Sequence, residues 1–224
     1  MPVVVLLLAG GGFAIWYFVF RDTAPPRAAL VERDTDEESA LPGESPDGAW
    51  EISPGTEAAP VFVGYRIQEL FGGDTIKRTA AGRTEVVTGA MTVDGDTVTA
   101  VDVVADVQQL QSDQDRRDNY IADNALQTNQ FPEATFALTE PIELRTRPTV
   151  GESIATTAIG ELTLHGVTRE VEVEIEAAWT GDVIDVAGHA PIVLGDYDID
   201  APDTPIVSVD GDGEMEFQLV FTRA

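Results

Sequence analysis

The sequence predicts an all-β fold, an eight-stranded antiparallel β-barrel with one helix between strands 3 and 4, preceded by a single N-terminal transmembrane helix. Three observations predict it. An unbroken apolar run opens the chain, apolar and polar residues alternate over most of the remainder, and one stretch in between has helical spacing. The predicted parts are a transmembrane anchor over 1–21, an acidic proline-rich linker over 22–48 and a barrel domain over 49–224.

The anchor is predicted from the run between Pro2 and Phe20, which holds only apolar residues and glycine. Its length is close to the ~20 residues of a spanning helix, and Trp16 and Tyr17 stand near its end, where amphipathic rings prefer the interface. A cleaved signal peptide is the competing interpretation, although its apolar region is usually shorter and no small-x-small cleavage site follows Phe20.

Orientation depends on a weaker signal. Arginines follow the apolar run and none precedes it, so the positive-inside rule alone would place the domain on the cytoplasmic side of the membrane. Long domains, however, translocate largely regardless of charge. We therefore expect a single-pass protein of the cell membrane with an extracytoplasmic domain, on a flexible stalk because proline, acids, serine and glycine dominate 22–48.

From Trp50 onward the dominant period is two. In the segment 169–180 the residues Val171, Val173 and Ile175 share one face, with glutamates between them on the other, which is typical of a strand with one apolar and one wet side. Turn signals such as Asp94-Gly95-Asp96 separate the strands, so we expect antiparallel neighbours that close into a barrel. The predicted strands are 59–69, 83–94, 97–108, 134–144, 156–165, 169–180, 183–194 and 213–223.

The stretch between Ser112 and Phe131 breaks this alternation. Its apolar residues fall at helical spacing, and acids crowd its first turn, so a helix with Ser112 or Asp113 as N-cap is predicted. Such a helix in mid-meander is placed to close one mouth of the barrel. Eight-stranded barrels either fill with side chains or hold one small ligand, and the sequence alone leaves both open.

Composition excludes several functions. The chain has 40 acidic against 13 basic residues, a net charge of −27, which opposes binding to nucleic acid. The absence of cysteine excludes disulfides, thiol nucleophiles and thiolate zinc sites. Of two histidines, His165 is expected as a polar turn residue. No nucleophile elbow or phosphate loop is present, so we predict a protein that is not an enzyme, with no cofactor, no metal site and no catalytic residues.

Two acidic stretches have turn-like sequences. The run from Asp196 to Thr204 superficially suggests a calcium loop, but Ala201 and Val207 occupy the positions where such a loop needs glycine and glutamate. The segment 210–213 is expected to form a hairpin turn or a bulge.

Four blocks of sequence resemble the YceI-like family of polyisoprenoid-binding, lipocalin-like proteins. They are WEISPG from Trp50, RRDNYI from Arg116, FPEATF from Phe131 and IGELTLHGVTREV from Ile159. Together they span about residues 50–224, and the anchor and acidic linker resemble membrane-tethered actinobacterial members. One departure is the sequence Asp196–Ile199, where the family carries a Phe-Gly-Ile-like stretch; its added acids near an expected tunnel mouth disfavour an anionic, pyrophosphate-type head group.

The resemblance implies a lipocalin-like barrel whose apolar tunnel takes an isoprenoid or similar amphiphile. We therefore expect the domain to sequester or transport an isoprenoid or quinone-like lipid at the outer face of the membrane. The alternative is a non-catalytic structural or protein-interaction module with a side-chain-filled barrel, and a homodimer stays open. The candidate ligand-binding residues are Val63, Tyr65, Ile67, Phe71, Arg116, Tyr120, Phe131, Phe136, Val173, Ile175, Trp179, Phe217 and Leu219.

Overall fold

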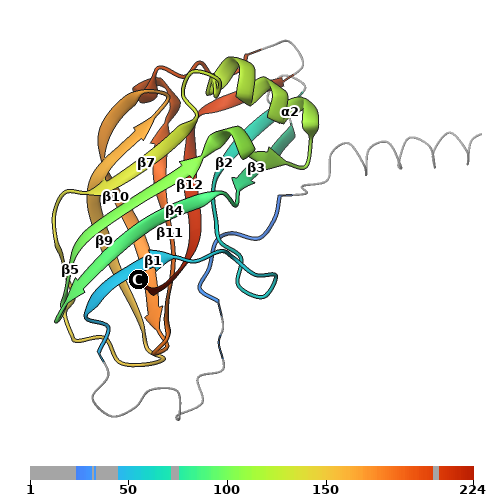
Figure 1. Ribbon diagram of the computed structural model, residues 1–224. Coiled ribbons are helices and arrows are strands. Elements are labelled where there is room, and N and C mark those ends of the chain that lie inside the picture. Colours follow the sequence, from blue (N-terminus) through green and yellow to red (C-terminus); the bar gives the residue numbers. More distant parts are fainter. Residues whose placement is uncertain (1–23, 32, 34–44, 72–75, 204–206) are drawn as a thin grey trace, which may run out of the picture.

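The structure, a computed structural model, describes residues 24–31, 33, 45–71, 76–203 and 207–224 (Figure 1). It consists of strands with short helical segments between them. The strands are β1 (Gly48–Ile52), β2 (Phe62–Phe71), β3 (Ile76–Thr84), β4 (Val87–Asp94), β5 (Thr97–Asp106), β6 (Gln111–Ser112), β7 (Glu133–Leu138), β8 (Ile142–Glu143), β9 (Ser153–Leu164), β10 (Val167–Trp179), β11 (Val183–Val193) and β12 (Val207–Arg223). The helical segments are η1 (Val107–Gln109), α2 (Asp115–Tyr120), η2 (Ile121–Ala125) and η3 (Leu194–Tyr197).

One antiparallel sheet forms the barrel. Its strands follow in the order β1-β4-β5-β7-β9-β10-β11-β12, and the circle closes because β1 pairs with β4 on one side and with the end of β12 on the other. Trp50 stands at this closure, opposite both Met91 and Arg223. Closure removes the exposed edges of these strands. The predicted eight-stranded antiparallel barrel is confirmed.

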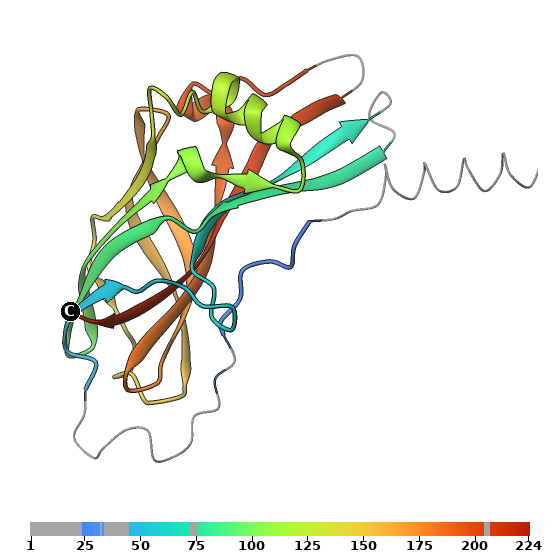
Figure 2. The same ribbon diagram turned by 45° about the vertical axis from the view of Figure 1, so that its right-hand side comes forward.

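The β2–β3 hairpin extends the sheet beyond this circle. β2 pairs with the first part of β12, from Val207 to Gln218, whereas β1 pairs with the last part. β3 pairs with the outer side of β2 and carries the sheet away from the barrel axis (Figure 2). The pairing of β12 with β2 shifts register between Val209 and Gly213, so the expected turn or bulge at 210–213 is a β-bulge.

The predicted strand boundaries were wrong mainly around this hairpin. β3 was not predicted, and the predicted strand 83–94 is the end of β3 plus β4, separated at Glu85 and Val86. The physical reason is that β3 is covered on both faces. Its neighbouring residues Ala80 and Ala81 point to opposite sides of the sheet and are both buried, so no apolar–polar alternation marks the strand.

The helix lies between β5 and β7, where it was expected, but it is shorter. It comprises α2 and one π-helical turn, η2, instead of most of the stretch from Ser112 to Phe131. The predicted N-cap was wrong, because α2 is preceded by Gln114 and no side chain caps it. Ser112 instead donates its amide and hydroxyl to Asp118, one turn into the helix.

The N-terminal predictions fall largely on residues that are not described. The predicted anchor, 1–21, lies outside the described residues, and no helix within the described part of the chain is long and apolar enough to cross a bilayer. Part of the predicted linker is described. Residues 24–31 and 33, which we call the strap, lie along the outside of the barrel (Figure 1, right).

Candidate functional site

The interior of the barrel contains an apolar cavity. Every strand from β4 to β12 that forms the circle contributes lining residues, and β2 contributes Val63. Inward-pointing residues of β12 illustrate the arrangement: Met215, Phe217 and Leu219, alternate residues of the strand, all line the cavity. The strand alternation that closes the barrel therefore also makes its lumen apolar.

The cavity has a volume of about 150 Å³. At 10–15 Å³ of such volume per water-sized atom, about ten non-hydrogen atoms fit, or roughly two isoprene units. Two glycines help to create this room. A Cβ on Gly160 would lie 2.4 Å from Phe136 Cζ, and one on Gly188 would lie 2.5 Å from Phe217 Cζ, so each glycine makes space for a luminal aromatic ring. The lumen is therefore not filled by its own side chains.

The lining offers almost no polar group. Among the described residues of the lining, only Thr135, Thr156 and Glu152 have a hydroxyl or a carboxylate, and the indole N–H of Trp179 already donates to the carbonyl of Gly181 at 2.9 Å. An apolar ligand would cover few donors or acceptors of the lining, whereas a polar ligand would lose its hydration with little compensation. The chemistry of the cavity suits a hydrocarbon chain.

One end of the cavity is closed. Leu162 and Met215 line it, and behind them Leu162 forms a buried apolar cluster with Ile192, Tyr197 and Ile199. Ala125 and Leu126, from η2 and the residue after it, pack on this cluster. The helical segment thus contributes to closing this end, as was expected from its place in the chain. We call this the helix end.

The opposite end is open, and we call it the mouth. Glu152 is exposed and also lines the cavity, so the cavity reaches solvent beside it, together with Pro46 and Pro148. An ion pair of 3.0 Å between Arg147 and Asp47 joins the two segments that carry these prolines. Hydrogen bonds from Ser45 and from the amide of Gly95, with the charge of Arg147, lower the pKa of Asp47, so this link is charged at neutral pH.

The acids at 196–200 lie away from the mouth. Tyr197 belongs to the cluster at the helix end, so Asp196 and Asp198, its neighbours, also lie there. The expectation that these acids stand near a tunnel mouth was wrong, because η3 folds back over the closed end of the barrel. They therefore give no reason to reject an anionic head group at the mouth.

More than half of the candidate ligand-binding residues line the cavity. These residues come from strands whose alternation was recognised in the sequence. They are Val63, Phe136, Val173, Ile175, Trp179, Phe217 and Leu219.

The other candidates lie elsewhere. Tyr65, Ile67 and Phe71 continue along β2 beyond Val63, into the hairpin that leaves the barrel, so they are not on the lining. Tyr65 lies over Gly82, and burial raises the pKa of its phenol. Phe131 packs edge-on against His165 with 4.7 Å between ring centroids.

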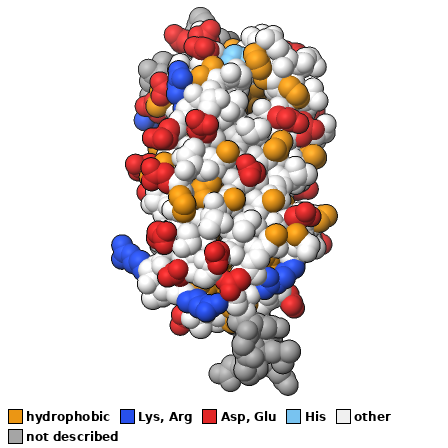
Figure 3. Space-filling view, turned by 60° about the vertical axis from the view of Figure 1, so that its left-hand side comes forward, with side chains coloured by type: hydrophobic (Ala, Val, Ile, Leu, Met, Phe, Trp, Pro, Cys, Tyr) orange, Lys and Arg blue, Asp and Glu red, His pale blue; other side chains and the backbone are white. Residues whose placement is uncertain are grey.

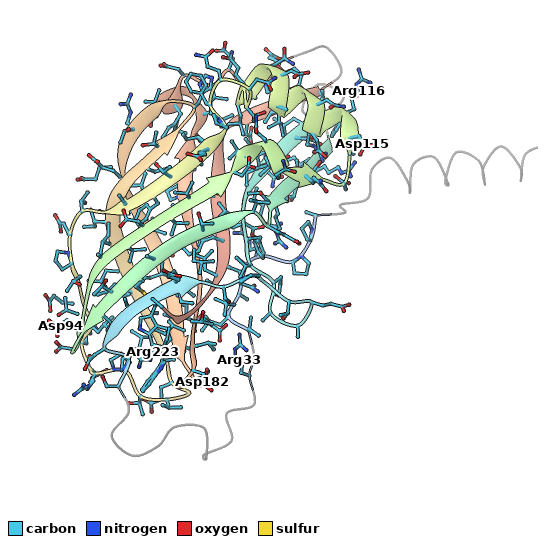
Figure 4. The ribbon with its side chains drawn as sticks, in the orientation of Figure 1. Arg33, Asp94, Asp115, Arg116, Asp182 and Arg223 are labelled. Atoms are coloured by element: carbon cyan, nitrogen blue, oxygen red, sulfur yellow. The ribbon has the colours of Figure 1, made fainter. Side chains whose placement is uncertain are left out.

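Arg116 and Tyr120 are exposed on α2, and Figure 4 shows Arg116 at the helix end, pointing away from the barrel. The neighbouring Arg117, in contrast, forms ion pairs with carboxylates of the domain. It donates to both carboxylate oxygens of Glu69, at 2.7 and 3.0 Å, and to Asp113 at 2.6 Å. Burial alone would lower the pKa of Arg117, but these hydrogen bonds raise it above its ordinary value. Arg117 thus fixes α2 to β2 and carries no ligand contact in the lumen.

Sequence reasoning missed the lining residues of β4, β5, β9 and β11. Most of these residues are small or β-branched, so no aromatic side chain drew attention to them. The strands β5, β9 and β11 themselves were predicted. Their alternation would have identified them, since every second residue of a barrel strand faces inward. Examples are Val101 and Val103 in β5, Ile154 and Ala158 in β9, and Val186 in β11.

Comparison with known proteins gives a consistent result. The family model described as the YceI-like domain matches residues 55–221. A UPF0312 protein of Vibrio parahaemolyticus is 27% identical over 173 residues, which are 73% of this chain and 82% of that protein. A UPF0312 protein of Vibrio campbellii is 25% identical over 173 residues, with the same two shares, 73% and 82%.

Solved structures with 17% identity share the fold. One is a polyisoprenoid binding domain from Saccharophagus degradans implicated in plant cell wall breakdown, with a TM-score of 0.60, 17% identity, and coverage of 78% of this chain and 98% of that one. Another is BcnA of Burkholderia cenocepacia, with a TM-score of 0.53, 17% identity, and coverage of 70% and 95%.

Proposed function

We propose that this chain, which belongs to the YceI-like family, binds a long apolar lipid of the isoprenoid or quinone type in its barrel and holds it as a non-catalytic carrier. The observation that carries the proposal is the lumen itself: a cavity of about 150 Å³, apolar along its length, closed at the helix end and open at the mouth. The polyisoprenoid binding domain from Saccharophagus degradans, which shares the fold, supports the choice of lipid.

Apolar burial supplies the affinity. Each methylene transferred from water contributes ~0.8 kcal/mol, so an isoprene unit contributes up to ~4 kcal/mol before ordering costs. Because about two units fit, a longer tail has to extend through the mouth or displace lining side chains. Affinity then rises with tail length over the first units and levels off, while the head group stays outside beside Glu152, Arg147 and Asp47.

The cellular setting is part of the same proposal. With residues 1–21 as a membrane anchor and the barrel outside the cytoplasm, the carrier would hold its lipid at the outer face of the membrane. The apolar run from Pro2 to Phe20 supports this placement.

A substitution that fills the lumen tests the proposal. Ala158 points into the cavity from β9, whereas Ala155 lies on the same strand and is exposed. We expect Ala158→Trp to weaken displacement of a bound naphthalene dye by farnesol or by a longer polyprenol at least tenfold, and Ala155→Trp to leave it unchanged. Overpacking costs typically 1–3 kcal/mol, so thermal unfolding is measured for both variants. If Ala158→Trp does not fold, Val101→Phe, a smaller addition to the same lining, takes its place.

Two results would contradict the proposal. One is dye binding and displacement that are equal in the two alanine variants. The other is native mass spectrometry and organic extraction of the full chain, purified from a membrane-containing host, that recover no lipid.

A further inference from the structure

The strap is attached to the barrel wall through its backbone. Arg66 of β2 and Arg83 of β3 donate to the carbonyls of two consecutive prolines, Pro25 and Pro26, the second at 2.5 Å. A proline has a fixed φ and no amide hydrogen, so in such an extended segment the carbonyl is the one backbone group that can hydrogen-bond to the wall. The sequence Pro-Pro therefore suits an extended segment held by two guanidinium groups.

Glu216 is the centre of this attachment. It lies on the outer face of β12, is 1% exposed, and accepts hydrogen bonds from Arg66 at 3.1 Å and Arg83 at 2.7 Å. The amide of Ala28 in the strap donates to the same carboxylate at 3.2 Å. A buried carboxylate is tolerated only when it is paired and hydrogen-bonded, and here the strap supplies one of its donors.

A second attachment fixes the strap nearer the mouth. Arg33 binds Asp185 of β11 through two hydrogen bonds, of 2.5 and 2.7 Å, and Asp185 is 1% exposed. Between the two attachments Val31 packs against the hydrophobic core. Figure 4 shows Arg33 on the strap side of the barrel, toward the end that also carries Asp94 and Arg223. The strap is thus held at both ends and in between.

Charge distinguishes the strap wall from the rest of the barrel. β2, β3 and β12, the wall under the strap, together carry five basic residues, Arg66, Lys77, Arg78, Arg83 and Arg223, against five acidic ones, Glu69, Asp210, Asp212, Glu214 and Glu216. β10 carries four glutamates against the single base Arg169. In Figure 3, which shows the side turned away from the strap in Figure 1, acidic side chains are distributed over most of the surface. In a chain of net charge −27, the charge-balanced wall under the strap is less repelled by an anionic leaflet than the β10 face is.

We propose that the strap holds the β2–β3–β12 wall against the membrane surface, so that the barrel lies on the bilayer with this wall facing the lipid head groups. The inference rests on the anchor of the proposed function. With the strap docked, only residues 22 and 23 lie between the anchor and the first strap residue, Ala24, a reach of about 10 Å from residue 21. Without docking, residues 22–47 would form a flexible linker with an r.m.s. length of about 30 Å. The strap would therefore keep the lipid carrier close to the membrane that supplies its cargo.

Fluorescence energy transfer on the full chain tests this arrangement. The chain has no cysteine, so Lys77→Cys on β3 and Ala100→Cys on β5, both exposed positions, each give a unique dye site. The protein is reconstituted into vesicles of phosphatidylcholine and phosphatidylglycerol that carry an acceptor on the head groups. We expect efficient transfer from residue 77 and clearly weaker transfer from residue 100.

Releasing the strap by substitutions confined to the strap itself provides the matched comparison. Ala28→Pro removes the amide that binds Glu216, and Arg33→Ala removes the pair with Asp185. In the double variant we expect transfer from residue 77 to fall at least twofold and the two dye sites to become similar. Arg116→Ala, the same charge change on exposed α2, should leave both values unchanged.

Three outcomes would overturn the inference. The first is equal transfer from the two dye sites in the intact chain. The second is equal transfer in the double variant and in the intact chain. The third is a chain that does not co-float with the vesicles, which would mean that the anchor prediction is wrong. Dye displacement by polyprenols, run on the same samples, reports the lumen independently, so failure of this inference is distinguishable from failure of the proposed function.

Discussion

The two faces of β12 are both buried, in opposite ways. Met215, Phe217, Leu219 and Phe221 face the lumen, where they surround empty space among mostly apolar neighbours. On the outer face, Glu216 is buried in contact with two arginines and the strap. The lumen side is apolar and hollow, whereas Glu216 on the outer face is charged and accepts hydrogen bonds from Arg66, Arg83 and the amide of Ala28.

This difference explains what each face contributes. A hollow apolar face has no directional requirement and accepts any ligand of suitable bulk, so it serves binding. A buried charged face is stabilising only with all of its partners in place, so it specifies one arrangement of strap and wall. The luminal face therefore tolerates substitution better than the outer face does.

Replacing two neighbouring residues, one on each face of β12, should show that the luminal face tolerates substitution better. We expect Glu216→Gln to destabilise the fold by about 3 kcal/mol, because it leaves Arg66 and Arg83 without their buried counter-charge. Phe217→Leu removes part of a ring that already borders a cavity, so about 1 kcal/mol is expected. Urea denaturation at neutral pH measures both.

The control for the charged face is Glu214→Gln. Glu214 pairs with Arg27, whose side chain is 63% exposed, and pairs of this kind contribute about 0–1 kcal/mol. If Glu216→Gln costs no more than Glu214→Gln, the outer face is not the more demanding one, and the comparison between the two faces fails.

The same strand shows how far sequence prediction reaches. The alternation of the predicted strand 213–223, which gave the candidates Phe217 and Leu219, correctly identified which residues face inward, because a strand's period of two is local. Such alternation also predicts a wet opposite face, as for 169–180, and at Glu216 this was wrong. Glu216 is buried by Arg66, Arg83 and Ala28, residues far away in the sequence, and no local pattern records which distant segment will cover a strand.

The helix gives a second example. The block RRDNYI contains two neighbouring arginines, and it is Arg117 that braces α2 on a carboxylate, that of Glu69. Arg116 was nevertheless chosen as the ligand-binding candidate. The choice between neighbours depends on which side of a short helix faces β2, and a helix of one turn and a half plus a π-helical turn has too little periodicity to decide it.

A glycine substitution tests how tightly the luminal face of β12 is packed. A Cβ on Gly188 would lie 2.5 Å from both Phe217 Cζ and the carbonyl oxygen of Glu174. We expect Gly188→Ala to cost about 1–2 kcal/mol by overpacking and to reduce polyprenol binding, because Phe217 has to move into the cavity. Gly211→Ala on the same sheet is the control, since a Cβ there meets nothing within 4 Å. Equal stability and equal binding of the two variants would show that the ring does not depend on Gly188.

Acid should weaken the contact between the strap and the outer face of β12 and leave the lumen unchanged. Burial alone would raise the pKa of Glu216, but the hydrogen bonds from Arg83, Arg66 and the amide of Ala28 lower it below the usual glutamate value, ~4.3. A lowered folded-state pKa means that this group's stabilisation is complete above the unfolded-state pKa and is lost as pH falls through the folded-state pKa. We therefore expect the strap to stay docked from neutral pH to about pH 5 and to loosen below about pH 4.

A spin label at Ala29→Cys, an exposed strap position, measures this loosening as increased mobility. The acid transition should disappear in Glu216→Gln, in which the label is already mobile at neutral pH. Retention of the naphthalene dye should change less over the same range, because Glu152, at the mouth, is the only carboxylate that the described part of the chain places on the lining. Dye release that precedes strap loosening would mean that the lumen, and not the charged outer face, is the acid-sensitive side of the barrel.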